Sequence, residues 1–285
     1  MSALPAAASK SPALSDADDL RGFHFKRLLR KPLTWLLIVG FTVVAGGLGV
    51  LFFGPVPGAV LAAIAFALGP ITVFAIADAQ SGDAFFAAYA KQHDLTLAAR
   101  GPLPEATPLL RKGNDRFAER SLSGSLGDGV EGTIALYTYE LEANDSKDDR
   151  SDCHRFTVGL VEIPESAGHV PELYCLSRAG SGPLEDVEDA FRDSGQRVTL
   201  ESGALDKRCE IFAGKGQDEN WLRQLFAPTF IVWLTDVAPD GFSFELVDGS
   251  LCCYLHGHAE STGALDTMRK ATVAVASRLG DESKE

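Results

Sequence analysis

The chain has 285 residues, of which 46% are hydrophobic and 23% charged, and its net charge at pH 7 is −13. This composition excludes a disordered or low-complexity chain. The charge is unevenly distributed, because residues 1–79 carry a net +2 and residues 80–285 a net −15. Binding to a phosphate backbone requires clustered Lys and Arg, so the acidic main body excludes nucleic acid as a partner.

The most informative segment is a run of 46 residues, 32–77, without a charged side chain. Two apolar stretches, 33–53 and 59–77, are separated by the helix-breaking sequence Gly54-Pro55-Val56-Pro57-Gly58. Each stretch is close to the roughly 20 residues that a helix needs to cross about 30 Å of hydrocarbon. The sequence therefore predicts a two-helix transmembrane hairpin over residues 32–78, with the lipid bilayer as its partner. The alternative, a buried hairpin of a soluble protein, would ordinarily keep a polar face.

The flanking charges predict the orientation of this hairpin. Basic residues gather just before the first stretch and are absent from the connecting turn; they are Arg21, Lys26, Arg27, Arg30 and Lys31. The side of a membrane with the excess of Lys and Arg is the cytoplasmic side. Two crossings return the chain to that side, so we expect a two-span protein of the cell membrane with both termini in the cytoplasm. Residues 1–31 are expected to form a disordered tail and a basic juxtamembrane segment.

Small residues four apart occur in both stretches, as Ala45/Gly49, Ala59/Ala63 and Ala65/Gly69. They allow helix backbones to approach closely, so we expect the two helices to pack on each other, or on a second copy of the chain. Neither stretch has an ionisable residue, which argues against a transporter or pump. The five cysteines lack paired spacing and are expected to be free thiols in a reducing cytosol.

Residues 79–285 are predicted to form one cytoplasmic domain in which the two-residue period of β-strands dominates. Strands are expected at residues 116–123, 132–141, 154–163, 173–177, 198–201 and 208–213. Helices are expected at residues 83–93, at 218–237 with a break near Pro228, and at 264–279. Strands joined by hairpins, with helices late in the chain, predict an α+β fold in which a C-terminal helix packs on a mainly antiparallel sheet.

The clearest local pattern is Asp248-Gly249 between two alternating runs, which predicts a type I′ hairpin. Pairing Val247 with Ser250 then sets Glu245 opposite Cys252. One face of this hairpin is apolar and is expected to face the core; it carries Phe242, Phe244, Leu246, Leu251, Cys253 and Leu255. The other face carries Ser243, Glu245, Val247, Cys252, Tyr254 and His256.

A candidate metal site lies on that second face. His256 and His258 form an H-x-H pattern, and Cys252 lies four residues before His256. In a continuous strand these three side chains project to the same side, within reach of one zinc ion together with Glu245. The alternative is that they are ordinary residues of a polar face. No catalytic residue, and no cofactor other than zinc, is predicted.

Two further patterns are better explained by loops. Residues 127–132 match G-x-G-x-x-G, but a strand-like sequence follows where a nucleotide site needs a helix, so we expect a hairpin turn. The acid-rich residues 140–152 lack the glycine and glutamate spacing of an EF-hand and are expected to form a solvated loop.

Three segments carry a resemblance to a group of known proteins. They are Thr107-Pro108-Leu109-Leu110-Arg111-Lys112-Gly113, Leu225-Phe226-Ala227-Pro228-Thr229-Phe230 and Phe244-Glu245-Leu246-Val247-Asp248-Gly249. Together with the apolar hairpin, they make the chain resemble bacterial two-span membrane proteins of unknown function that have one cytosolic globular region. The resemblance implies this layout, and it implies no activity and no functional residue.

Three hypotheses of function follow. The first is a non-enzymatic, membrane-tethered module that binds a ligand or a membrane-protein partner, or senses a signal, at the cytoplasmic surface. The second is a membrane-anchored, zinc-dependent hydrolase that uses Cys252, His256 and His258. The third is a structural subunit of a membrane assembly. Zinc analysis of the purified protein separates the first two hypotheses, and copurification of stoichiometric partners identifies the third.

Overall fold

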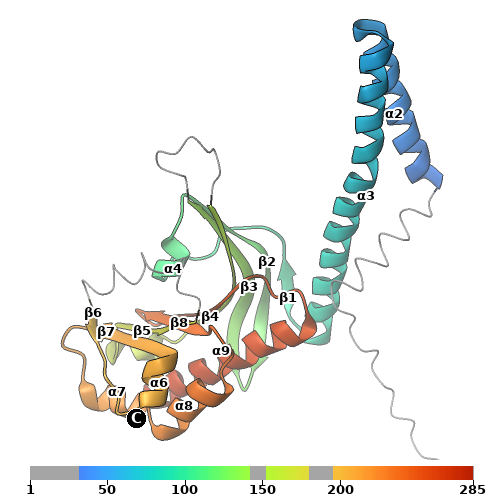
Figure 1. Ribbon diagram of the computed structural model, residues 1–285. Coiled ribbons are helices and arrows are strands. Elements are labelled where there is room, and N and C mark those ends of the chain that lie inside the picture. Colours follow the sequence, from blue (N-terminus) through green and yellow to red (C-terminus); the bar gives the residue numbers. More distant parts are fainter. Residues whose placement is uncertain (1–31, 142–151, 180–194, 285) are drawn as a thin grey trace, which may run out of the picture. The chain divides into compact units, whose positions relative to one another are not determined.

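The computed structural model describes residues 32–141, 152–179 and 195–284 (Figure 1). The predicted tail and basic segment, residues 1–31, and most of the acid-rich segment, residues 142–151, lie outside the described residues. The chain divides into two compact units, Met1–Tyr89 and Ala90–Glu285.

The first unit contains a helical hairpin made by α2 (Pro32–Phe53) and α3 (Pro55–Gln92). Gly54 joins the helices with a positive φ of 95°, which is accessible to glycine at low cost. Pro55 then begins α3, because its fixed φ suits a first helical residue and its missing N–H is not needed there. The breaker cluster of the sequence therefore becomes a turn of one residue.

The two helices contact each other through small residues, as expected, although partly through different ones. A Cβ on Gly46 would lie 2.9 Å from the Cβ of Ala62, and a Cβ on Gly49 would lie 2.8 Å from the Cα of Gly58. Gly46, Gly49 and Gly58 are buried, whereas Ala59 is exposed. The contact is therefore shifted by about one residue from two of the three predicted pairs.

The helix expected at residues 83–93 is the end of α3 rather than a separate element. Between Ala77 and Asp83 the sequence has no proline and a single glycine, Gly82, so nothing there interrupts the helical hydrogen bonds. Within the described part of the chain, none of the helices combines the length and the apolar character required to cross a bilayer.

The second unit is built on a nine-stranded sheet in which every neighbouring pair of strands is antiparallel. The strand order is β1-β2-β3-β4-β9-β8-β5-β7-β6. The bounds are β1 (Thr96–Ala98), β2 (Asp115–Gly127), β3 (Val130–Leu141), β4 (Asp152–Glu162), β5 (Glu172–Ser177), β6 (Gly195–Arg197), β7 (Cys209–Gly214), β8 (Ser243–Val247) and β9 (Ser250–His256). The prediction of an α+β fold with a large antiparallel sheet is confirmed.

One predicted strand is wrong. The strand expected at residues 198–201 lies earlier in the chain, as β6, which pairs with β7. The last hydrogen bond to β7 runs from the N–H of Val198 to the carbonyl oxygen of Ile211, at 2.8 Å. The chain then leaves β7 because Ser202 caps the short helix α6 (Gly203–Arg208), with its hydroxyl accepting from the N–H of Leu205 at 3.3 Å. A local capping interaction therefore overrides the strand propensity of this segment.

Two turns fix the register of the sheet. Asp128-Gly129 joins β2 to β3, Asp248-Gly249 joins β8 to β9, and all four residues have positive φ, as a type I′ turn requires. Glu245 lies opposite Cys252, as predicted. The G-x-G-x-x-G pattern is therefore a hairpin turn, as expected.

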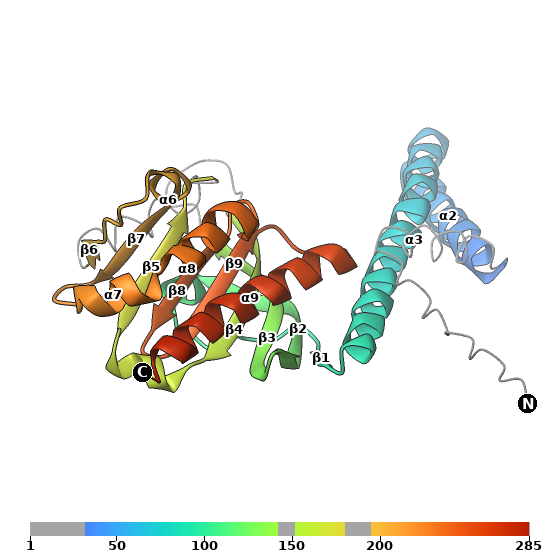
Figure 2. The same cartoon turned by 90° about the horizontal axis from the view of Figure 1, so that it is seen from below.

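One face of the sheet is covered by α9 (Thr262–Glu282), which crosses β2, β3, β4 and β9 (Figure 2). Its buried residues include the whole predicted stripe of Leu265, Met268, Thr272, Val275 and Leu279. The helix approaches the sheet closely at Gly159, where a Cβ would collide with the Thr272 hydroxyl. The predicted packing of a C-terminal helix on the sheet is confirmed.

The helical region before β8 is broken near Pro228, as predicted. It consists of α7 (Glu219–Leu225), α8 (Pro228–Val232) and a π-helical turn at Trp233–Val237. Phe226 and Trp233 both lie against Phe230, with ring centroids 5.8 Å and 5.7 Å apart. The remaining short elements are α4 (Pro108–Arg111) and a 3-10 turn at Pro164–Gly168.

The opposite face of the sheet is also buried, which corrects the expectation of an ordinary polar face there. Ser243, Glu245, Cys252 and Tyr254 are each at most 1% exposed. They are covered by residues 101–114, called the cover segment below, which include α4 and pack Leu109 and Leu110 into this second core. In Figure 1, α4 and α9 lie on opposite sides of the sheet.

Candidate functional site

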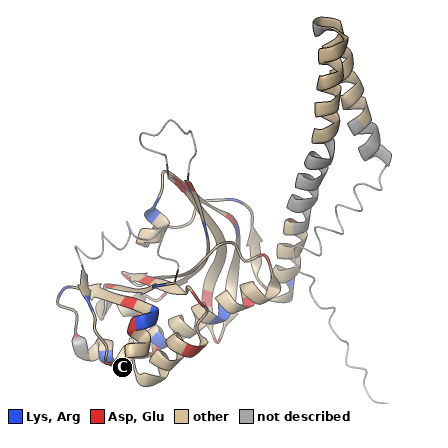
Figure 3. Ribbon diagram, viewed as in Figure 1, with Lys and Arg blue, Asp and Glu red and all other residues tan. Residues whose placement is uncertain are grey.

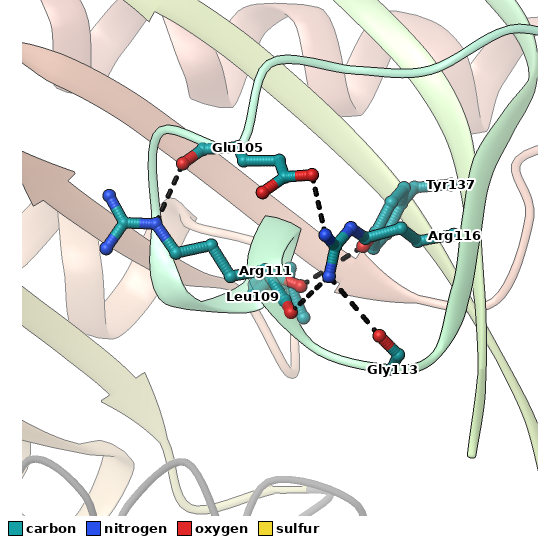
Figure 4. Close-up of polar contacts among 6 residues, drawn as sticks. All are labelled: Glu105, Leu109, Arg111, Gly113, Arg116 and Tyr137. Atoms are coloured by element: carbon teal, nitrogen blue, oxygen red, sulfur yellow. Dashed lines mark hydrogen bonds and ion pairs between the residues drawn. The ribbon is translucent and has the colours of Figure 1, made fainter. Parts of the chain in front are cut away.

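The cover segment is held on the sheet by Arg116 of β2 (Figure 4). The Arg116 guanidinium donates to the Glu105 carboxylate at 2.6 Å and to the carbonyl oxygen of Arg111 at 2.7 Å. The Nε of Arg111 in turn donates to the carbonyl oxygen of Glu105 at 2.8 Å. Charge-assisted hydrogen bonds are stronger than neutral ones, so these contacts fix a segment that has little secondary structure of its own.

Beneath the cover segment lies Glu245 of β8, which is completely buried. Its Oε2 accepts a hydrogen bond from the N–H of Leu109 at 3.1 Å, and its Oε1 has no hydrogen-bond partner among the described residues. Burial raises the pKa of this carboxyl to about 7, while the Leu109 amide and the Thr107 hydroxyl oppose that rise. Glu245 therefore changes its charge near neutral pH.

Aromatic side chains complete this buried layer. The Tyr137 hydroxyl donates to the carbonyl oxygen of Leu109 in the cover segment at 3.3 Å. Tyr139 stacks on Phe156 with ring centroids 5.7 Å apart, and Tyr254 meets the same ring edge-on at 6.0 Å. Burial raises the pKa of Tyr137 and Tyr254 far above that of a free phenol, so both hydroxyls stay protonated at neutral pH.

Cys252, the first predicted zinc ligand, lies in this layer opposite Glu245 and is completely buried. Burial and the neighbouring carboxylate raise the pKa of its thiol well above the usual range. Because the thiolate is the form that attacks substrates and binds metals, this thiol is poorly suited to either role. All five cysteines are free; Cys153 is exposed and the other four are buried.

The two predicted histidine ligands are directed differently. Gly257 lies between them with a positive φ of 83°, which interrupts the alternation of the strand. His256 is exposed, and its ring centroid lies 4.6 Å from that of Phe156. The Nε2 atom of His258 lies 3.1 Å from the Tyr137 carbonyl oxygen and 3.3 Å from Oγ1 of Thr138. The Thr138 side chain points to the face of β3 opposite to that of Tyr137.

The structure therefore does not bring Cys252, His256 and His258 to one point. Burial lowers the pKa of both imidazoles. Within residues 32–141, 152–179 and 195–284, no group of three or more His, Cys, Asp or Glu side chains is arranged to hold a metal ion. The zinc site stays a prediction, which metal analysis of the protein tests.

A pocket of about 460 Å³ opens between the cover segment and the sheet. Its lining includes Leu103, Thr107 and Leu110 of the cover segment, together with Glu131 of β3 and Leu160 and Glu162 of β4. This volume is in the range of small-molecule sites. We call it the acidic pocket.

The acidic pocket adjoins the buried carboxyl. Thr107 lines the pocket and is completely buried, and its hydroxyl is close enough to Glu245 to influence the pKa of that carboxyl. The hairpin pattern of the sequence points to Glu245, but no pattern used above predicts Thr107, Glu131 or Glu162 as site residues. The strand alternation around the two glutamates was a usable signal, because it places both side chains on the face that carries Tyr137.

No protein-family model matches the chain, and neither a curated protein sequence nor a solved structure matches it.

Proposed function

We propose that the chain is a membrane-tethered binding module: residues 32–77 anchor it in a bilayer, and the acidic pocket binds a small ligand on the cytoplasmic side. The observation that carries the binding role is the pocket of about 460 Å³ enclosed by the cover segment beside the buried Glu245. A pocket with an apolar wall and a few polar groups is typical of small-molecule sites.

The tethering role is supported by the surface of the hairpin and by the sequence of the whole tract. Large apolar side chains are exposed along it, among them Phe41 at 62%, Leu51 at 78% and Val56 at 74%. The described part of the hairpin from residue 39 to residue 68 has no charged residue, as the tan ribbon in Figure 3 shows. So much apolar surface is rare in soluble monomers and suits a lipid environment.

Membrane fractionation of the full-length chain tests the tether. After lysis without detergent and ultracentrifugation, we expect the protein in the membrane pellet, resistant to an alkaline wash and released by detergent. A variant with Val44→Lys and Leu48→Lys should lose much of this association, because each lysine at the centre of a span costs about 3 kcal/mol. A control with two lysines at exposed positions of the sheet unit, Asp152→Lys and Glu201→Lys, should stay in the pellet. Wild-type protein in the supernatant would refute the tether.

Titration with a small apolar probe tests the pocket. We expect 1-hexanol to bind to the full-length chain in nonionic detergent micelles, measured by isothermal titration calorimetry with the micelles alone as the blank. Ala106→Trp, which places an indole in the pocket lining, should weaken this binding at least about tenfold by removing the apolar space. Val237→Trp, at a side chain that is 65% exposed elsewhere, should leave it unchanged. Equal binding by wild type and Ala106→Trp would refute the binding site.

A further inference from the structure

The acidic pocket has a marked charge asymmetry. Among its described lining residues are two carboxylates, Glu131 and Glu162, and neither a lysine nor an arginine. The two carboxylates belong to paired strands, since Thr133 of β3 lies opposite Leu160 of β4. Glu131 and Glu162 lie two residues beyond this pair on their own strands, so the alternation of side chains places both on the same face.

The positions of the two carboxylates are supported by the sheet. Glu162 pairs with Ser250 of β9, and the Ser250 hydroxyl donates to Oε2 of Glu162 at 2.8 Å. Glu131 is the second residue of β3, which begins directly after the type I′ turn at Asp128-Gly129. Both acids therefore project from rigid strands rather than from loops.

The rest of the lining is largely apolar. Leu103 and Leu110 of the cover segment and Leu160 of β4 contribute to this lining. Behind the Thr107 wall is the buried Glu245, whose Oε1 has no hydrogen-bond partner among the described residues. The site thus joins an apolar interior to negative charge that no basic residue of its lining offsets.

We propose that the acidic pocket binds an organic cation with an apolar body, such as an alkylammonium compound, with the ammonium group at Glu131 and Glu162 and the alkyl chain among the leucines. This inference rests on the proposed binding role of the same pocket. An anion would be repelled by the two carboxylates, and a neutral molecule would gain only the apolar contacts. A hydrated inorganic cation would gain nothing from the leucine side chains.

The charge complementarity has a measurable size. At a separation of about 4 Å in water, one carboxylate attracts a unit positive charge by roughly the energy of a fivefold change in Kd. We therefore expect Glu131→Gln and Glu162→Gln each to raise the Kd of the cation about fivefold, and the double variant to raise it roughly 25-fold. The substitutions retain side-chain size, so the apolar contacts stay.

The experiment compares three probes with the same six-carbon chain: hexyltrimethylammonium, 1-hexanol and hexanoate. Each is titrated into the full-length chain in nonionic micelles at pH 7.5, for wild type, the Glu131→Gln/Glu162→Gln variant and Glu140→Gln. We expect wild type to bind the cation most tightly and hexanoate most weakly. The double variant should lose the preference for the cation but keep hexanol binding, which also shows that it is folded. Glu140→Gln, which removes one carboxylate at the far end of β3, should behave like wild type.

The outcomes separate the two proposals. Hexanol binding that Ala106→Trp abolishes, with no tighter binding of the cation, overturns the cation inference and leaves the binding role standing. An equal loss of cation affinity in Glu140→Gln also overturns it, because the attraction would then come from the net charge of the chain. Failure of all three probes to bind overturns the proposed binding role together with the inference.

Discussion

The two faces of the sheet are both buried, but they are buried by different means. One packs against α9, a helix of 21 residues with an apolar stripe. The other packs against the cover segment, whose regular part is the four-residue helix α4, and encloses Glu245 and the acidic pocket. A long helix on an apolar face supplies stability, whereas an irregular segment held by a few polar contacts opens at lower free energy and leaves space for a ligand.

The largest expected effect lies on the α9 face. Phe244 is completely buried there, so Phe244→Ala should reduce the free energy of unfolding by about 3–5 kcal/mol, through lost apolar burial and the cavity left behind. Urea unfolding of the detergent-solubilised chain, followed by tryptophan fluorescence, measures this. Val237→Ala, at an exposed site, should change stability by less than about 0.5 kcal/mol. Equal effects of the two substitutions would contradict the description of this face as a core.

The second largest effect is a pH dependence of the free energy of unfolding, caused by Glu245 on the cover-segment face. The pKa of Glu245 in the folded protein, about 7, is above the ordinary value of 4.5, so the folded state binds this proton more tightly than the unfolded state does. Its contribution to stability is full below pH 4.5 and is lost as the pH rises through 7. Between pH 5 and pH 8 this carboxyl should cost the wild type roughly 2–3 kcal/mol.

Glu245→Gln should remove this loss, so that its unfolding free energy falls less between pH 5 and pH 8 than that of the wild type. Thermal or urea unfolding at several pH values in this range provides the measurement, and Glu140→Gln is the matched control that should follow the wild type. A variant at position 245 with an unchanged pH dependence would show that this carboxyl does not titrate in the range.

The smallest expected effect concerns the attachment of the cover segment. Arg116→Met removes the hydrogen bonds to Glu105 and Arg111 and should loosen the segment by about 1 kcal/mol. Hydrogen exchange should accelerate in residues 105–113 while the amides of α9 keep their protection. Arg155→Met, at an exposed position of β4, should change neither. Equal acceleration in α9 and the cover segment would show that the two faces do not open independently.

Much of the sheet could be predicted because its determinants are local. The Asp-Gly pair at 248–249 fixes both a turn type and a register, and Glu245 therefore lies opposite Cys252, as predicted. The break at Pro228 and the stripe of α9 likewise follow from single residues and a period. The membrane hairpin and its orientation stay predictions of the sequence.

The site could not be predicted to the same extent, because it depends on contacts between distant segments. The hydrogen bond from Leu109 to Glu245 joins residues 136 positions apart. The cover segment has no hydrophobic periodicity from which its position on the sheet could be predicted. The divergence of His256 and His258 depends on the positive φ of one residue, Gly257. A strand pattern that ignores this glycine places both imidazoles on one side.

The distribution of the cysteines has a practical consequence. Four thiols are shielded inside the protein, and only Cys153, near the start of β4, is exposed. Maleimide reagents react with accessible thiolates, so the native chain should be labelled at this one position without any engineered cysteine-free background. A fluorophore or spin label there would report on the sheet unit, and unfolding would be seen directly as the appearance of four more reactive groups.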